Sequence, residues 1–401
     1  MFLFLAFRNL FRNVRRTIAV LLTVALGAGA LFAFDGFIQG VLEEYRDSTI
    51  HSHYGYGQIH TKGYRGNAFE DPQKHWISDG QRLEQFLYEQ PGVDQVFPRV
   101  SFSALLKKGK TTLSGSGQGI AAEREAQFFH GLNIEEGQTL TDQSDGILLG
   151  SGLAHSLNAK PGDTVTVMAT SNRGILKKEQ FVVSGIFYTG SLDFDSRVFR
   201  VPLESAQKLL KTSKIESVAL SLHSLSDWNG IAAKVAENFP NLEATPFDIL
   251  DEVYYKHSVD WLNAQFAVVQ AIILSIVLLG IFNAISTAIL ERKQEIGNLR
   301  ANGEPVSQVM LLIIAEGGLL AVIGSLIGVG GAYCVLKILV YKGLSMPPGP
   351  GMTNQFLVVF TFKPSMIAYT MVLSTIAAVA ASFLAGLRVS KMTIAKCLRS
   401  Y

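Results

Sequence analysis

The sequence predicts a helical membrane protein with four transmembrane helices and a large α+β domain outside the membrane. Apolar residues make up 48% of the 401 residues and charged residues 17%, a balance typical of an integral membrane protein with a polar portion attached. The apolar residues concentrate in four stretches, each long enough for the ~20 helical residues that a bilayer core requires. The polar segment between the first two stretches is long enough to bury a core of its own.

Segment boundaries follow from these stretches. We place the spans at 17–39, 263–290, 305–340 and 365–388, the α+β domain with stalk helices at 40–262, and a short loop at 341–364. The first stretch lacks a small-x-small cleavage site, so we interpret it as a retained anchor and not as a signal peptide. Segments 1–16, 291–304 and 389–401 are basic and therefore face the cytoplasm.

Segment 1–16 combines apolar residues at helical spacing with arginines on another face. This pattern predicts an amphipathic helix that lies in the headgroup layer and contacts lipid phosphates. The arginines concerned are Arg8, Arg12 and Arg15. An ordinary basic flank would carry the same charges, so both interpretations stay open.

Strand-like and helix-like segments alternate in the domain at 40–262. Residues 93–116 predict two strands around a turn at Lys108-Gly109-Lys110, and 164–168 and 180–187 alternate as half-buried strands do. Segments 79–89, 203–210 and 227–238 predict helices. The domain is therefore expected to be of mixed α+β class.

Glycines are concentrated in the third span. Gly324 and Gly328 have the spacing that allows two helix backbones to approach closely in lipid. Packing within one subunit and packing between subunits would both explain the motif.

Motifs for catalysis, cofactor binding and metal binding are missing from the sequence. No phosphate-binding Gly-x-x-x-x-Gly-Lys-Ser/Thr run and no nucleophile elbow is present, so we predict no catalytic residue and no nucleotide bound by this chain. His51, His53 and His60 have no cysteine or carboxylate at a suitable interval, and we predict no metal site. The formal charge of +2 does not suggest nucleic acid binding.

The segment at 291–304 differs from an ordinary basic loop. Its residues are compatible with a short helix, with Gly303 as the C-terminal stop and Pro305 in the first turn of the next helix. Ile296 and Leu299 form a small apolar face, which a groove on a soluble partner could receive. The charged residues around that face are Glu291, Arg292, Glu295 and Arg300. A solvated loop is the alternative.

The chain resembles the MacB/FtsX/LolC-LolE class of ABC transporter permeases, also called type VII. The resemblance rests on the basic start Ala6-Phe7-Arg8-Asn9-Leu10, the segment from Glu291 to Gly303, and Pro161-Gly162-Asp163 in the insert. It implies a MacB/LolC-like permease fold in the bacterial inner membrane, with 40–262 as a periplasmic core domain plus a second lobe. The length, the four spans and the missing fused ATPase are most similar to the lipoprotein-releasing LolC/LolE type.

The resemblance also implies partners. The expected partners are an ATPase dimer that binds ATP and Mg²⁺, a second permease subunit in a homodimer or heterodimer, membrane lipid, and a periplasmic carrier or adaptor. The expected contacts to the ATPase come from the residues at 291–303 named above. The tail 389–401 lacks the proline usual in related tails, so we do not include it among the expected contacts to the ATPase.

The expected function is extraction of a lipoprotein or another amphiphile from the membrane for delivery to a periplasmic carrier. Phe34, Phe37 and Ile38 are the candidate residues to face that cargo, where a dimer interface would open to lipid. Two alternatives stay open. One is MacB-like efflux with an adaptor and an outer-membrane channel, and the other is FtsX-like regulation of a cell-wall hydrolase without transport.

Overall fold

The structure, a computed structural model, describes residues 14–67, 72–129, 132–143, 145–171, 174–189, 191–252, 256–340, 342–347 and 355–390. The chain divides into two compact units. The helical unit comprises Met1–Glu44, Val259–Ser345 and Leu357–Tyr401. The insert comprises Tyr45–Ser258 and Met346–Phe356.

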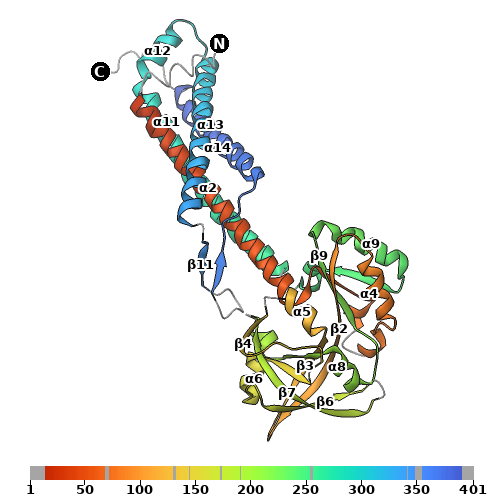
Figure 1. The fold of residues 1–401 in the computed structure, drawn as a ribbon. Coiled ribbons are helices and arrows are strands. Elements are labelled where there is room, and N and C mark those ends of the chain that lie inside the picture. The colour runs from red at the N-terminus through yellow and green to blue at the C-terminus, as the bar shows by residue number, and fades with distance from the viewer. Residues whose placement is uncertain are drawn as a thin grey trace. The chain divides into compact units, whose positions relative to one another are not determined.

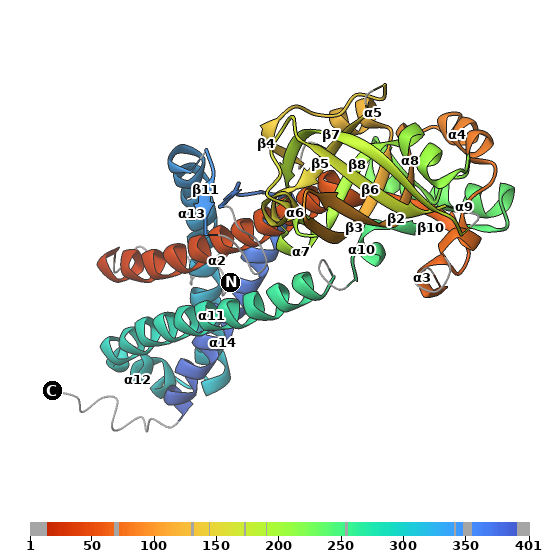
Figure 2. The ribbon, with the colours of Figure 1, turned by 90° about the horizontal axis from the view of Figure 1, so that it is seen from below.

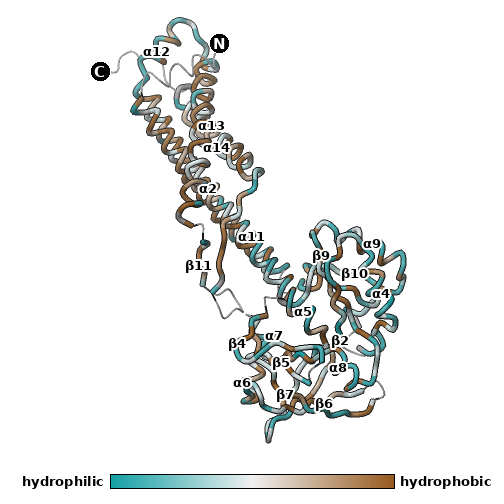
Figure 3. The backbone as a smooth tube through the Cα atoms, viewed as in Figure 1, coloured by the Kyte–Doolittle hydropathy of each residue, from teal (hydrophilic) through white to brown (hydrophobic). Residues whose placement is uncertain are grey.

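Long apolar helices form the helical unit (Figure 1). Among the described residues, 4 helices are long and apolar enough to cross a membrane, as the sequence predicts. Their apolar residues follow one another along most of each helix (Figure 3). The bounds are α2 (Val14–Thr49), α11 (His257–Glu291), α13 (Val306–Leu339) and α14 (Pro364–Ser390), and the short α12 (Lys293–Ala301) joins α11 to α13.

The first two long helices extend beyond the predicted spans. α2 continues to Thr49, and α11 already begins at His257, so both include the helical stalks expected beside the spans. The predicted boundary at residue 16 falls inside α2, because the helix is unbroken from Val14. The rest of the predicted in-plane helix, 1–13, lies outside the described residues, as does 391–401 of the predicted tail.

Small residues bring α2 close to α13. A Cβ atom added to Gly328 would lie 2.1 Å from the carbonyl oxygen of Ala25, and one on Gly324 would lie 2.8 Å from Val24 Cβ. A Cβ on Gly29 would lie 3.0 Å from the carbonyl oxygen of Gly328. Both glycines of the motif therefore pack against a helix of the same chain, which agrees with the intrasubunit interpretation.

The same face of α2 carries two more closely packed glycines. Gly36 faces the ring of Phe362, and a Cβ on Gly40 would lie 2.0 Å from the carbonyl oxygen of Val359. Together with Ala25 and Gly29 they recur at the spacing of one helical face. The segment that precedes α14 therefore lies against the backbone of α2.

One mixed sheet forms the centre of the insert (Figure 2). Within the described residues it has 10 strands in the order β10-β1-β9-β2-β3-β8-β5-β7-β4, and β6 pairs with β2 and β7. The pairs β3–β8 and β5–β7 are parallel. The bounds are β1 (Gly57–Thr61), β2 (Val93–Lys108), β3 (Thr111–Ile120), β4 (Asn133–Gly137), β5 (Gly146–Gly150), β6 (Thr164–Thr170), β7 (Leu176–Tyr188), β8 (Val198–Pro202), β9 (Ser217–Leu222) and β10 (Leu242–Pro246).

β2 is the long strand shared by both parts of the sheet. Its first half pairs with β9, and its second half pairs with β6, while β3 runs back along it. The predicted turn is confirmed, since Gly109 separates β2 from β3 with a φ of +59°.

Helices cover two large apolar cores in the insert. One core includes Ile59, Leu83 and Val235, and the other includes Leu106, Val167 and Leu209. The predicted helices correspond to α4 (Gly80–Tyr88), α8 (Leu203–Leu210) and α9 (Trp228–Asn238), and α5 (Ala122–Phe128) and α6 (Ser151–Leu157) add to them. Shorter segments are η1 (Ile50–Tyr54), α3 (Tyr64–Asn67), η2 (Pro72–His75), α7 (Leu192–Asp195), η3 (Leu225–Asp227) and α10 (Phe247–Leu250).

The segment predicted as a loop at 341–364 contains two short strands. β11 (Leu344–Met346) pairs with β12 (Phe356–Val358). Each strand has only three residues, which is too short for an alternating pattern to be recognised in the sequence.

Candidate functional site

The chain reverses direction between α11 and α13 through an elbow, which we define as residues 291–305. Arg292 separates α11 from α12 with φ −96° and ψ 16°. α12 ends at Ala301, and Gly303 follows in the left-handed region with a φ of +95°. The predicted stop is therefore confirmed, because a glycine at this position adopts that conformation without strain. Pro305 then precedes α13.

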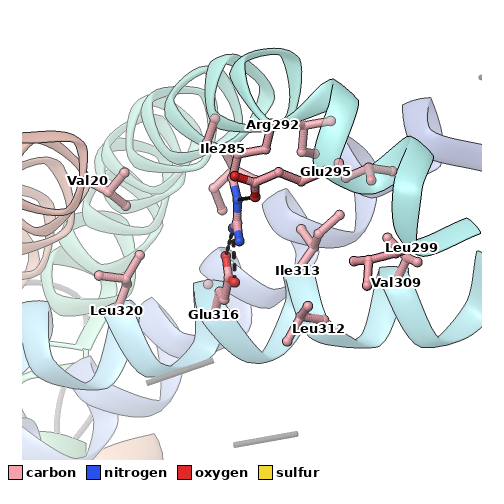
Figure 4. A pocket seen from close by; sticks show the side chains of 14 residues that line it. Val20, Ile285, Arg292, Glu295, Leu299, Val309, Leu312, Ile313, Glu316 and Leu320 are labelled. Carbon is pink, nitrogen blue, oxygen red and sulfur yellow. Dashed lines mark hydrogen bonds and ion pairs between the residues drawn. The ribbon is translucent and has the colours of Figure 1, made fainter. Parts of the chain in front are cut away.

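An ion pair between Arg292 and Glu316 holds the elbow to the third long helix (Figure 4). Arg292 Nη1 donates to Glu316 Oε2 at 2.8 Å and to Oε1 at 3.1 Å. Arg292 Nε donates to Glu295 Oε2 at 3.0 Å. The side chains of Arg292 and Glu316 are only 15% and 12% exposed. One guanidinium therefore joins a carboxylate of α12 to a carboxylate of α13.

The surroundings of Arg292 favour its charged form. Burial alone would lower its pKa, but the nearby carboxylates of Glu316 and Glu295 more than offset this, so its pKa is raised. Charge-assisted hydrogen bonds of this length are stronger than neutral ones. Arg292 therefore stays positively charged near neutral pH.

Apolar residues of the elbow face the chain's own helices. Ile296 is 6% exposed and belongs to a buried cluster with Ile289, Val309 and Ile313. A cavity of about 60 Å³ lies beside it and is lined by residues of α2, α11, α12 and α13. This corrects the expectation that Ile296 faces a soluble partner, since its side chain covers the ends of α11 and α13. Leu299 lines the same cavity but is 38% exposed.

The outward face of α12 carries amide side chains. Gln294 and Asn298 are exposed one helical turn apart, and Asn302 continues the row beyond the helix. Among the predicted contact residues, Glu291 and Gly303 are exposed and Arg300 is half-buried. Gln294 and Asn298 were not predicted, because the sequence-based prediction placed Ile296 and Leu299 on the outward face. Once Ile296 is known to face inward, the helical periodicity places Gln294 and Asn298 on the outward face.

The other predicted site residues lie elsewhere. Arg15 is exposed in the first turn of α2, whereas Arg8 and Arg12 lie outside the described residues. Phe34 and Phe37 are half-buried and pack edge-to-face on Phe266 of α11, with centroid distances of 5.9 and 6.4 Å. Ile38 is 8% exposed, so in this conformation it is a packing residue and not an open contact for cargo.

The histidines considered as metal ligands are dispersed. His60 Nε2 lies 3.0 Å from Thr245 Oγ1, and His51 lies beside Asp47. Across the described part of the chain, no group of three or more His, Cys, Asp or Glu side chains has a geometry suited to a metal ion.

Comparison with known proteins relates both units to membrane transport proteins. The family described as MacB-like periplasmic core domain matches residues 17–238, and FtsX-like permease C-terminal matches residues 267–394. The lipoprotein-releasing system transmembrane protein LolE of Haemophilus influenzae is 24% identical over 355 residues, or 84% of this chain and 83% of that protein. LolC of Xylella fastidiosa is 24% identical over 327 residues, or 79% of this chain and 75% of that protein. The periplasmic region of MacB from Actinobacillus actinomycetemcomitans has 16% identity, covers 49% of this chain and 90% of its own, and has a TM-score of 0.38.

Proposed function

Because this chain belongs to the MacB/FtsX/LolC-LolE class of ABC transporter permeases, we propose that a separate ATPase drives it through the elbow. The chain is a multi-pass protein of the bacterial inner membrane with a periplasmic domain. The elbow is one membrane crossing away from the insert in the chain and therefore faces the cytoplasm. In this proposal ATP and Mg²⁺ bind to the ATPase and not to this chain.

The ion pair between Arg292 and Glu316 is the observation that carries the proposal. A force on α12 reaches α13 through two charge-assisted hydrogen bonds and through the buried side chain of Ile296. If only solvent-exposed charges connected α12 to α13, α12 could move without moving α13. The exposed side chains of Gln294 and Asn298 lie on the outward face of α12, and we propose that the ATPase contacts this face.

The names of the relatives support a lipoprotein or another amphiphile as cargo. LolE and LolC are both described as transmembrane proteins of a lipoprotein-releasing system, and this chain covers three quarters or more of each. We propose that the chain pairs with a second permease subunit, extracts the amphiphile from the inner membrane and delivers it to a periplasmic carrier. The half-buried rings of Phe34 and Phe37 provide an apolar surface for an acyl chain.

The coupling role can be tested on the outward face of α12. We expect the double variant Gln294→Arg/Asn298→Arg to reduce co-purification of the ATPase, and ATP hydrolysis by the reconstituted complex, by at least about tenfold, because two added charges and long side chains prevent close docking. Gln308→Arg is the matched control, since Gln308 is exposed in the first turn of α13 on the same side of the membrane. Equal hydrolysis in the double variant and the control would contradict this role of α12.

The cargo can be tested separately in liposomes. The reconstituted complex should release a labelled lipoprotein when ATP and a periplasmic carrier protein are both present. Release without ATP, or ATP-dependent export of a soluble compound through a co-purifying adaptor, would reject lipoprotein extraction in favour of efflux. Binding of a cell-wall hydrolase to the periplasmic domain, without release of lipoprotein, would favour the regulatory alternative.

A further inference from the structure

Two arginines and one glutamate are buried together inside the insert. Arg99 on β2, Glu125 on α5 and Arg200 on β8 are each no more than 2% exposed. Arg99 donates from Nε and Nη2 to the two carboxylate oxygens of Glu125 at 2.6 and 2.9 Å, and from Nη1 to the carbonyl oxygen of His53. The carboxylate is therefore already engaged by Arg99 in a bidentate pair.

Arg200 is only partly satisfied by this arrangement. Its Nε donates to Gln118 Oε1 at 3.2 Å, and its Nη1 lies 3.5 Å from Glu125 Oε2. Its Nη2 is buried and has no hydrogen-bond partner among the residues that the structure describes. Burying a guanidinium N–H without a hydrogen-bond partner costs more free energy than burying an unpaired neutral donor, because the guanidinium stays charged.

The charges of the cluster do not balance. Within the described part of the insert, two guanidinium groups face one carboxylate, which leaves one positive charge in excess. Burial, together with the charge of Arg99, lowers the pKa of Arg200 to about 10 in spite of Glu125, so the group remains protonated near neutral pH. Burial and the two arginines also hold the pKa of His53 well below its usual value, so His53 adds no charge.

A cavity of about 150 Å³ has Arg200 among its lining residues. Its walls contain the charged residues Arg200 and Glu125, and its remaining lining is mostly apolar, with Phe129, Leu140 and Leu148 among the residues. Ala126 and Thr139 also line it and are exposed, so the cavity is open to the surface there. An apolar protein cavity of about this volume accommodates a ligand the size of benzene.

We propose that this cavity binds a small organic monocarboxylate, whose carboxylate accepts a hydrogen bond from Arg200 Nη2 and whose apolar body fills the cavity. A single negative charge neutralises the excess charge of the cluster. A dianion such as phosphate is disfavoured, because the Glu125 carboxylate lines the same cavity. A halide would satisfy the donor but leave the apolar walls empty.

The site can be tested with 4-fluorobenzoate on the full-length chain in detergent. Binding is followed by broadening of the ¹⁹F resonance, with 4-fluorobenzyl alcohol as the neutral ligand of similar shape. We expect the carboxylate to bind at least about tenfold more tightly than the alcohol, since only the carboxylate pairs with the guanidinium. Sodium butanoate should displace it, whereas sodium chloride at the same concentration should not.

Two variants separate the site from nonspecific binding. Arg200→Gln should abolish the preference for the carboxylate over the alcohol. Ala126→Trp fills the mouth of the cavity and should abolish binding of both ligands, while Gln127→Trp, on an exposed neighbour outside the lining, should not. If Arg200→Gln does not fold, Ala126→Trp still tests whether the ligand binds in this cavity. Equal affinity for the two ligands, displacement by chloride, or binding that survives Ala126→Trp would each overturn the proposal.

Discussion

Replacing Arg292 by methionine removes the two hydrogen bonds, of 2.8 and 3.1 Å, that join the elbow to Glu316. Removing one partner of a fully buried ion pair destabilises a protein by about 3–5 kcal/mol. Since the two side chains are 15% and 12% exposed, we expect the lower end of this range, about 3 kcal/mol. Glu316→Gln should cost less, about 1–2 kcal/mol, because Arg292 keeps its bond to Glu295.

The double variant Arg292→Met/Glu316→Met completes a thermodynamic cycle. Two apolar side chains fit the surrounding cluster, so its stability should return to within about 1 kcal/mol of the unchanged protein. The measurement is reversible unfolding of the full-length chain in mixed micelles. In the complex with the ATPase, we expect the double variant to hydrolyse ATP with reduced release of cargo, because the directional link to α13 is gone.

Different outcomes would refute the structural role and the coupling role of the ion pair. A loss of less than about 0.5 kcal/mol for Arg292→Met would refute the structural role of the ion pair, since this is the range of an exposed salt bridge. A double variant with both normal stability and normal release of cargo would be compatible with the structural role of the ion pair but would refute its role in transmitting force.

Two further predictions concern packing and pH. Gly328→Ala should destabilise the helical unit by about 1–3 kcal/mol, because its Cβ would lie 2.1 Å from the carbonyl oxygen of Ala25. Gly330→Ala should be neutral in the same unfolding assay, because no described atom outside the adjacent turns of α13 lies within 4 Å of the added Cβ. Burial raises the pKa of Glu216 from 4.5 to about 7. The folded insert therefore binds a proton that the unfolded chain releases, and stability should fall by about 3 kcal/mol as pH rises from roughly 4.5 to 7. Glu216→Gln should remove that decline in thermal unfolding scans, and an unchanged pH profile would count against it.

The long helices and the end of α12 could be predicted from the sequence because each depends on local information. A run of apolar residues is sufficient to identify a span. Gly303 terminates α12 through its own backbone conformation, whichever residues surround it.

The ion pair could not be predicted, because it depends on tertiary contacts. The sequence shows Glu316 in the third span, but it does not show which of the elbow cations Arg292, Lys293 and Arg300 pairs with it. The prediction that Ile296 faces a soluble partner was wrong for a similar reason, whereas Leu299 is 38% exposed. An amphipathic helix beside a membrane can turn Ile296 toward a partner or toward its own bundle, and the periodicity is the same in both cases.

The closely packed glycines on one face of α2 were not predicted, for a different reason. Gly29, Gly36 and Gly40 are distributed along a long apolar run, and only the structure shows that the face they share with Ala25 packs against α13 and the segment before α14. In contrast, Gly324 and Gly328 have a spacing that can be recognised in the sequence.

Glu316 also has a consequence for biogenesis. If α13 entered the bilayer by itself, its carboxyl group would have no partner, and a charged side chain in a membrane helix opposes insertion by roughly 2.5–3.5 kcal/mol at the helix centre. The guanidinium that neutralises this carboxylate lies just upstream, between α11 and α12. We therefore expect the translocon to release α11 and α13 into lipid together as a helical hairpin, with the ion pair already formed.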